Sequence, residues 1–181
     1  MSLLTQASLV LTPNAYKANK LYSIIPSSGN GDMVTTRATT ATRVNSSGLI
    51  ENVATGIPRL DYTGSVQSIL LEPQRTNLLL NSATVVTQTI TTTAVANTLS
   101  FYGTGTITLS GTFVGTLVGA GVSNRVTLTF TPTAGSLILT VSGSCTNGQL
   151  EQGAYATSYI PTTTSTVTRN VDIMTLNNIY T

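Results

Sequence analysis

Apolar and hydroxyl side chains alternate along most of the segment from Thr98 to Ser142. A period of two places one set of side chains in a core and the other in solvent, which a helix cannot do. The segment therefore predicts successive half-buried strands of an antiparallel sheet. The predicted core positions are Leu99 and Phe101, Ile107 and Leu109, Val126, Leu128 and Phe130, and Leu137, Leu139 and Val141.

Turn signals separate these strands at the spacing typical of a β-sandwich or β-barrel. Residues 132–135 (PTAG) are a clear turn, and glycines such as Gly103 and Gly111 indicate turns or bulges. No segment shows a helical period of useful length. We therefore predict an all-β chain: an antiparallel, jelly-roll-like β-sandwich with an irregular N-terminal extension.

The same patterns divide the chain into three parts. Residues 1–82 form an N-terminal attachment or arm region with a hairpin. Residues 83–161 form the β-sandwich core, whose first and last strands lie near 69–80 and 148–160. Residues 162–181 form a C-terminal strand or arm.

Within the arm region, local signals predict several elements. Thr12 and Pro13 favour one helical turn through Tyr16, because proline is common at the first helical position. Residues 21–25 read as a strand, and residues 45–48 (NSSG) as the loop of a β-hairpin. Residues 69–72 (ILLE) are predicted to be a buried strand.

Few residues in the chain carry a charge. Charged residues make up 8% of the 181 residues, against roughly 25% in average globular proteins. Such a chain relies on hydroxyls and amides for solubility or covers its surface in an oligomer, and we favour the oligomer. The eight basic residues are scattered and the net charge is +2, so we expect no nucleic-acid partner. No leader or membrane-spanning segment is recognised, so we expect a protein that is made in the cytoplasm and does not insert into a membrane.

Residues suited to catalysis are scarce. The chain has no histidine, the usual general acid or base near neutral pH. Most of its six carboxylates lie near an arginine in sequence, which favours local charge pairing. The single cysteine, Cys145, is expected to be a small buried side chain. We predict no catalytic residue, no metal site and no cofactor, hence no enzyme; a depolymerase would need two carboxylates that meet in space.

Two tyrosines are candidates for contact with a glycan. Tyr102 follows the core residue Phe101, so its ring is expected to point outward. Tyr155 lies in the segment that follows the last predicted sandwich strand. An exposed aromatic ring offers a flat apolar face to a sugar, although packing at an interface is the alternative for both residues.

Six blocks of sequence occur in a recognisable order, separated by less specific segments. They are residues 12–17 (TPNAYK), 38–51 (ATTATRVNSSGLIE), 57–62 (IPRLDY), 70–78 (LLEPQRTNL), 148–162 (GQLEQGAYATSYIPT) and 168–172 (TRNVD). This series resembles the tailed-bacteriophage virion proteins that include head fibres, head spikes and tail-fibre-like proteins. The blocks around Glu72 and Glu151 are the most specific.

The resemblance implies a carbohydrate-module-like β-sandwich between the flanking blocks, and a role as a structural part of the virion. It implies a head fibre, spike or fibre-base subunit that forms a homo-oligomer, typically a trimer, on capsid or tail proteins. The alternative is a carbohydrate-binding module of a tail fibre that recognises a host surface glycan.

The signature residues of these blocks are Arg59, Asp61, Glu72, Arg75, Glu151 and Tyr159. We expect Arg59 to pair with Asp61, and Arg75 with Glu72 or Glu151, in buried or half-buried ion pairs that fix the arms to the sandwich. Such pairs specify geometry more than they add stability.

Overall fold

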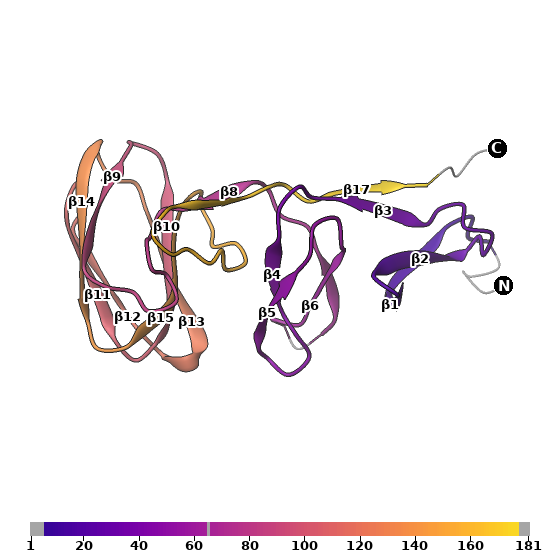
Figure 1. Ribbon diagram of the computed structural model, residues 1–181, viewed down its shortest axis with the longest axis horizontal. Coiled ribbons are helices and arrows are strands. Elements are labelled where there is room, and N and C mark those ends of the chain that lie inside the picture. Colours follow the sequence, from indigo (N-terminus) through magenta and orange to yellow (C-terminus); the bar gives the residue numbers. More distant parts are fainter. Residues whose placement is uncertain (1–5, 65, 178–181) are drawn as a thin grey trace. The chain divides into compact units, whose positions relative to one another are not determined.

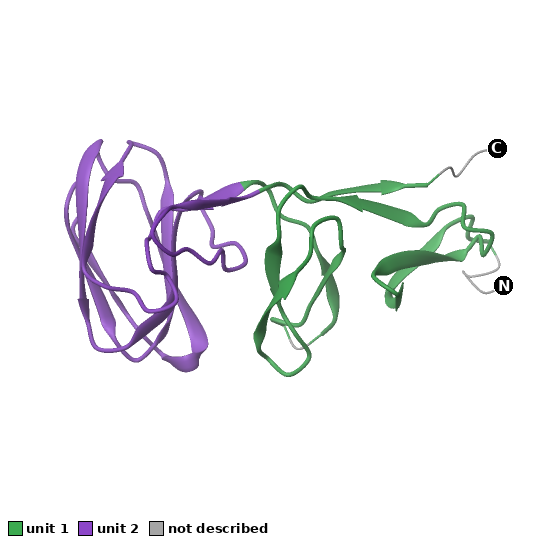
Figure 2. Ribbon diagram, viewed as in Figure 1, with its two compact units in different colours: residues 1–74, 170–181 green, residues 75–169 purple. Residues whose placement is uncertain are grey.

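The computed structural model describes residues 6–64 and 66–177, and every regular element among them is a β-strand. The predicted all-β class is therefore confirmed (Figure 1). The chain forms two compact units: unit 1 comprises Met1–Gln74 and Asn170–Thr181, and unit 2 comprises Arg75–Arg169 (Figure 2).

Unit 2 contains two antiparallel sheets with the strand orders β13-β10-β15 and β12-β11-β14-β9, and a short pair, β16-β8. Its strands are β8 (Arg75–Asn77), β9 (Gln88–Thr92), β10 (Asn97–Gly103), β11 (Thr106–Gly111), β12 (Gly115–Val118), β13 (Gly121–Phe130), β14 (Gly135–Ser142), β15 (Cys145–Gln152) and β16 (Val167–Arg169).

Both sheets contribute to one hydrophobic core, as the alternation predicts. Leu99 and Phe101 of β10 meet Leu137 and Leu139 of β14 in a single cluster, and all four are fully buried. The other predicted core positions belong to it as well, Val126, Leu128 and Val141 being partly buried. Cys145 is a buried free thiol in this cluster, as expected.

A bulge interrupts β10 at Gly103, one of the glycines that predict turns or bulges. The register of β10 with β13 shifts between Tyr102 and Gly103, and Gly103 has a φ of 129°, which side chains rarely adopt. A Cβ atom on Gly105 would lie 2.6 Å from the Ser142 carbonyl oxygen and 2.7 Å from Cys145 Sγ. Glycine therefore permits the close approach of the β10–β11 turn to the end of β14 and the start of β15.

Unit 1 is built from a four-stranded sheet of order β1-β2-β3-β17 and two hairpins, β4-β5 and β6-β7. Its strands are β1 (Val10–Lys17), β2 (Lys20–Ile25), β3 (Met33–Thr36), β4 (Ala41–Val44), β5 (Ile50–Val53), β6 (Arg59–Asp61), β7 (Ser68–Leu70) and β17 (Ile173–Leu176).

The N-terminal region is more regular than predicted. The helical turn after Thr12 is wrong, because Val10–Lys17 is a strand that pairs with β2. Pro13 lies in a register shift between Leu11 and Tyr16, where no ladder N–H is needed. Residues 69–72 are not a buried strand either: β7 ends at Leu70, and Leu71 is 50% exposed. The predicted strand at 21–25 and the hairpin around 45–48 are present.

The unit boundary differs from the expected one at residue 82. Residues 75–82 belong to unit 2 because Leu79 is buried in its core and the Asn77 amide donates to the carbonyls of Gly148 and Ile160. The C-terminal arm is divided: β16 lies in unit 2, and β17 extends the sheet of unit 1.

The two units bury very different amounts of apolar side chain. Among the described residues of unit 1, the buried apolar side chains are Leu21, Ala41, Val53, Pro58 and Leu60, whereas the whole core cluster lies in unit 2. Burial of apolar surface, the dominant favourable term in folding, is therefore concentrated in unit 2.

The alternation in β14 gives a matched test of this core. Leu139 is fully buried and its neighbour Ile138 is 39% exposed. We expect Leu139→Ala to lower the free energy of unfolding of unit 2 by about 2–5 kcal/mol through lost burial and a cavity. Ile138→Ala should cost less than about 1 kcal/mol. Denaturant unfolding of both variants checks this, and equal losses would contradict the assigned register.

Candidate functional site

The most buried charges of unit 1 surround the carboxylate of Asp172. Arg37 Nη1 donates to Asp172 Oδ1 at 2.7 Å, and Arg59 Nη2 donates to Oδ2. Arg59 Nη2 also lies 2.8 Å from Glu72 Oε2, and the Glu72 backbone N–H donates to Asp172 at 3.0 Å. Both arginine side chains have no exposed surface. We call these four residues, Arg37, Arg59, Glu72 and Asp172, the Asp172 cluster.

The Asp172 cluster connects distant parts of the chain. Arg37 also donates to the Ala54 carbonyl at 2.6 Å, and Arg59 donates to the Thr42 carbonyl at 2.9 Å. Burial raises the pKa of Asp172, but the hydrogen bonds from Arg59 and Arg37 outweigh it and hold this pKa below its ordinary value of 3.8. The carboxylate is therefore charged and fixes the C-terminal segment to the hairpins of unit 1.

Arg59 and Asp61 have different partners from those expected. Asp61 accepts hydrogen bonds from the backbone N–H groups of Val44, at 2.8 Å, and Thr63, at 3.0 Å. Arg59 is paired with Glu72 and Asp172 instead. Local spacing could not identify Asp172, because it lies 113 positions away from Arg59 in the sequence.

In unit 2, Glu151 is a completely buried carboxylate. It accepts hydrogen bonds from Gln149 Nε2 at 2.6 Å, the Thr157 N–H at 2.7 Å and the Thr157 hydroxyl at 2.6 Å. Arg75 Nε lies 3.6 Å from Glu151 Oε2, so Glu151 is an ion-pair partner of Arg75, one of the two carboxylates expected for it. This arrangement holds the start of unit 2 against its last long strand.

Tyr159 supports the same junction within unit 2. Its hydroxyl lies 2.7 Å from Ser82 Oγ, which also accepts the Thr162 N–H at 2.8 Å. Burial raises the pKa of Tyr159, with the Ser82 contact acting in the opposite direction. The hydroxyl is therefore a neutral structural group that links residues 82 and 159–162.

The two expected glycan contacts are placed differently. Tyr155 is 53% exposed, and the Arg75 guanidinium carbon lies 5.4 Å from its ring centre. Tyr102 is half-buried on β10, opposite Arg125 of β13 and Thr146 of β15. Arg75 therefore already covers part of the Tyr155 ring, and Tyr102 offers only part of its surface.

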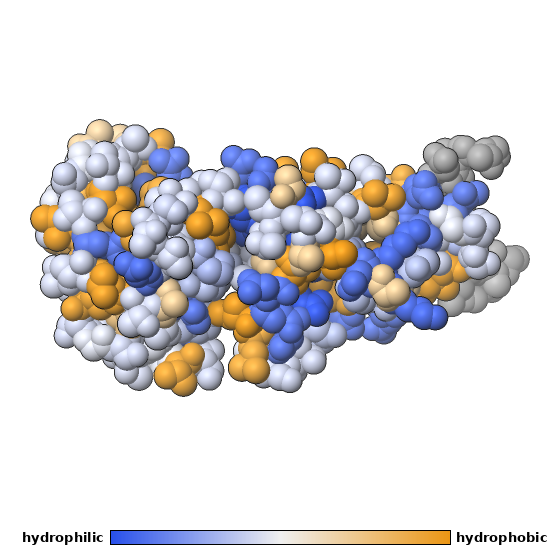
Figure 3. Space-filling model, viewed as in Figure 1, coloured by the Kyte–Doolittle hydropathy of each residue, from blue (hydrophilic) through white to orange (hydrophobic). Residues whose placement is uncertain are grey.

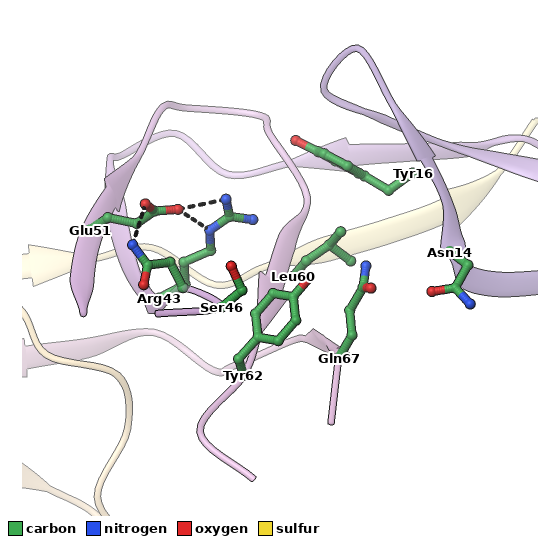
Figure 4. Close-up of a pocket in the computed structure, with 9 residues that line it drawn as sticks. Asn14, Tyr16, Arg43, Ser46, Glu51, Leu60, Tyr62 and Gln67 are labelled. Atoms are coloured by element: carbon green, nitrogen blue, oxygen red, sulfur yellow. Dashed lines mark hydrogen bonds and ion pairs between the residues drawn. The ribbon is translucent and has the colours of Figure 1, made fainter. Parts of the chain in front are cut away.

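A polar pocket of about 500 Å³ lies in unit 1 (Figure 4). Strand β1 and the hairpins β4-β5 and β6-β7 supply its walls. The Tyr16 ring reaches it from β1, and Tyr62 follows β6 beside Leu60 (Figure 4). The lining residues are Asn14, Tyr16, Arg43, Asn45, Ser46, Glu51, Leu60, Tyr62 and Gln67.

An ion pair with fixed geometry forms one wall of the pocket. Arg43 and Glu51 are cross-strand partners in the β4-β5 hairpin, and Arg43 Nε and Nη2 each lie 2.6 Å from Glu51 Oε1. The Asn45 amide donates to Glu51 Oε2 at 3.0 Å. The hydrogen bonds from Asn45 and Arg43 lower the pKa of Glu51 below its ordinary 4.5. The wall therefore holds an ionised pair without net charge.

This pocket is not apparent from the sequence. Tyr16 and Tyr62 lie in two of the ordered sequence blocks, but 46 positions of sequence separate them, and nothing local indicates that they line the same pocket. The cross-strand pair Arg43–Glu51 could have been found, because opposite charges at both ends of a predicted hairpin loop predict pairing.

The described residues hold no group of three or more histidine, cysteine, aspartate or glutamate side chains placed to bind a metal ion. Within residues 6–64 and 66–177, no helix is long and apolar enough to cross a membrane. The carboxylates are used as ion-pair and hydrogen-bond partners, including Asp32, which lies 3.0 Å from Lys20 Nζ.

No protein-family model matches the chain, and neither a curated protein nor a solved structure shows significant similarity to it.

Removing the charge of Asp172 should destabilise unit 1 strongly. In Asp172→Asn, Arg37 and Arg59 lose their shared counter-charge while remaining buried, which costs about 3–5 kcal/mol. Hydrogen exchange of the β3 and β17 amides measures the loss. Glu51→Gln, which breaks a partly exposed pair, is the control and should cost less than about 1 kcal/mol. Equal protection in the two variants would contradict the fastening role.

The same carboxylate predicts acid sensitivity of unit 1. The pKa of Asp172 is lower in the folded chain than its ordinary 3.8, so its contribution is complete above pH 3.8 and is lost as the pH falls through the folded value. The pKa values of Asp32 and Glu51 are lowered too, so the difference between the parent and Asp172→Asn isolates the Asp172 contribution. Hydrogen exchange at several pH values should show this difference shrinking in acid; a constant difference would contradict it.

Proposed function

We propose that this protein is a non-catalytic structural subunit of a tailed-bacteriophage virion, a head fibre, spike or fibre-base component that associates with copies of itself. Unit 1 serves as the attachment region and unit 2 as the displayed β-domain. The sequence blocks that resemble this family supply Arg59, Glu72 and Asp172 in unit 1, and Glu151 and Tyr159 in unit 2. The resemblance thus rests on residues whose buried polar contacts connect distant segments within each unit.

The observation that carries the proposal is the poor apolar core of unit 1. Only five apolar side chains are buried among its described residues, while ordering each residue costs about 1–2 kcal/mol of backbone entropy. Unit 1 would therefore gain stability by burying further apolar surface against a partner. Attachment in an assembly supplies that surface.

One face of the unit 1 sheet is suited to such burial. Strand alternation and the pairing of Val34 with Thr175 place Tyr22, Ile24, Val34 and Ile173 on the same face. These four side chains are 38–49% exposed. This set, which we call the open sheet face, spans β2, β3 and β17. Thr36 and Thr175 lie on the same face as the partners of Ile173 and Val34, and Lys20 Nζ lies 5.1 Å from the Tyr22 ring centre.

A second copy of the chain is the occupant that fits the open sheet face. In a ring of identical copies, the mainly apolar patch of each copy can be buried next to the symmetry axis without any need for charge complementarity. Residues of intermediate hydropathy, drawn pale, cover much of unit 2 on the face that Figure 3 shows, and charged residues make up only 8% of the chain. Self-association also agrees with the trimer that the family resemblance implies.

Light scattering of the purified full chain tests the self-association. We expect a mass of about three times the 18.8 kDa chain. Val34→Glu, which places a charge on the open sheet face, should shift the population to monomer. Val122→Glu, at a position of unit 2 that is 76% exposed, is the matched control and should leave the mass unchanged.

A parent chain that is monomeric at micromolar concentration would contradict the proposed assembly. The virion role has a separate readout: antibody labelling of phage particles should place the subunit on the capsid or tail. Its absence from purified particles would contradict that role even if the chain forms oligomers.

A further inference from the structure

The polar pocket of unit 1 takes no part in fastening the segments of the unit together through the Asp172 cluster. We propose that it is a binding site for a neutral saccharide, presented as part of a glycan. The class of ligand is indicated by the aromatic rings, the amides and the charge balance of the pocket wall, and binding requires neither Tyr102 nor Tyr155. Such binding does not depend on the oligomeric state.

The pocket has the size and the polarity of a site for a hydrophilic molecule. Its volume of about 500 Å³ lies within the usual range for small-ligand pockets, roughly 300–1,000 Å³. Those pockets are mostly apolar, whereas Leu60 is the only aliphatic residue among the described residues of this lining. A lipid or an apolar cofactor would remove water from the amides and the ion pair without using the hydrogen-bonding capacity that their contacts within the protein leave. A polyol can use that remaining capacity.

Two tyrosine rings supply the apolar part that a sugar requires. Tyr16 and Tyr62 are both half-buried, so part of each ring stays open to the pocket. A tyrosine combines an apolar ring with a hydroxyl group that can donate or accept a hydrogen bond. A pyranose has the complementary form, with an apolar C–H face and a rim of hydroxyls.

The amide groups are held in place before any ligand binds. Asn45 Oδ1 accepts the N–H groups of Ser47 and Leu49, both at 3.0 Å, and its Nδ2 donates to Glu51. Gln67 Nε2 donates to the Pro13 carbonyl at 3.1 Å. Side chains that are already ordered lose little entropy on binding. Amides both donate and accept, as the hydroxyls of a sugar do.

The balanced charges of the pocket wall favour a neutral sugar over an anionic ligand. Arg43 is the only cation among the lining residues that the structure describes, and Glu51 compensates its charge at 2.6 Å. Phosphates and nucleic acids need uncompensated positive charge, which this wall does not offer. A hydroxyl can accept from the guanidinium and donate to the carboxylate, and such charge-assisted hydrogen bonds are stronger than neutral ones.

The test is direct binding of defined neutral sugars to the full-length protein. The probes are maltotriose, cellotriose and tri-N-acetylchitotriose, with sialyllactose and an oligothymidylate as anionic comparisons. Saturation-transfer NMR and titration calorimetry detect binding. We expect at least one neutral trisaccharide to bind and both anionic probes to fail. Binding of the anionic probes alone, or of no probe, would overturn the inference.

Variants locate the bound sugar. Tyr62→Ala should weaken binding by about tenfold, the loss of one aromatic contact. Ser46 is an exposed hairpin-loop residue at the pocket, so Ser46→Trp should block the site without disturbing the core. Tyr102→Ala and Tyr155→Ala are the matched controls and should bind as the parent does.

Two further readouts make the outcome unambiguous. Hydrogen exchange of the β4 and β5 amides shows whether each variant is folded, and Ser46→Trp decides the matter if Tyr62→Ala is not. Retained binding in a folded Ser46→Trp, or loss in Tyr155→Ala alone, would place the sugar elsewhere and overturn the inference. The oligomer mass stays the same in all these variants, so failure of sugar binding is distinct from failure of the proposed assembly.

Discussion

The carboxylate of Asp172, shared between the buried guanidinium groups of Arg37 and Arg59, is the interaction on which unit 1 depends. Two buried cations and one buried anion would be unfavourable in isolation. They are tolerated because Glu72 adds a second carboxylate to Arg59, and because backbone carbonyls accept further guanidinium hydrogen bonds. The geometry is therefore specific: an apolar substitute could fill the space but could not join these particular segments.

This dependence explains why the units are stabilised in different ways. Unit 2 folds around Leu99, Phe101, Leu137, Leu139 and their neighbours, a core that tolerates conservative apolar exchange. Unit 1 has few buried apolar side chains among its described residues and relies on directional contacts. Directional contacts define the chain path closely but supply little net stability. The small apolar core of unit 1 agrees with the proposal that this unit buries further surface when the protein assembles.

Local periodicity makes the strands of unit 2 predictable from the sequence, whereas features that depend on distant contacts are not. The period-two pattern predicts the core-facing apolar positions of β10, β11, β13 and β14. It is wrong for Thr98 and Ser100 of β10, which are fully buried although alternation places them in solvent. Local reasoning fails at Pro13, where pairing with β2 overrides a helix signal. The partner of Arg59 and the pocket tyrosines could not be predicted, since both arise from segments far apart in the chain.

The core of unit 2 and the polar pocket of unit 1 are formed by different parts of the sequence. Residues 83–147 supply most of the unit 2 core, where burial constrains alternate positions and leaves the exposed hydroxyl positions free to vary. The pocket, in contrast, is lined from the blocks at 12–17, 38–51 and 57–62, together with Gln67. A saccharide bound in the pocket would therefore be held by residues of unit 1 and not by the core of unit 2.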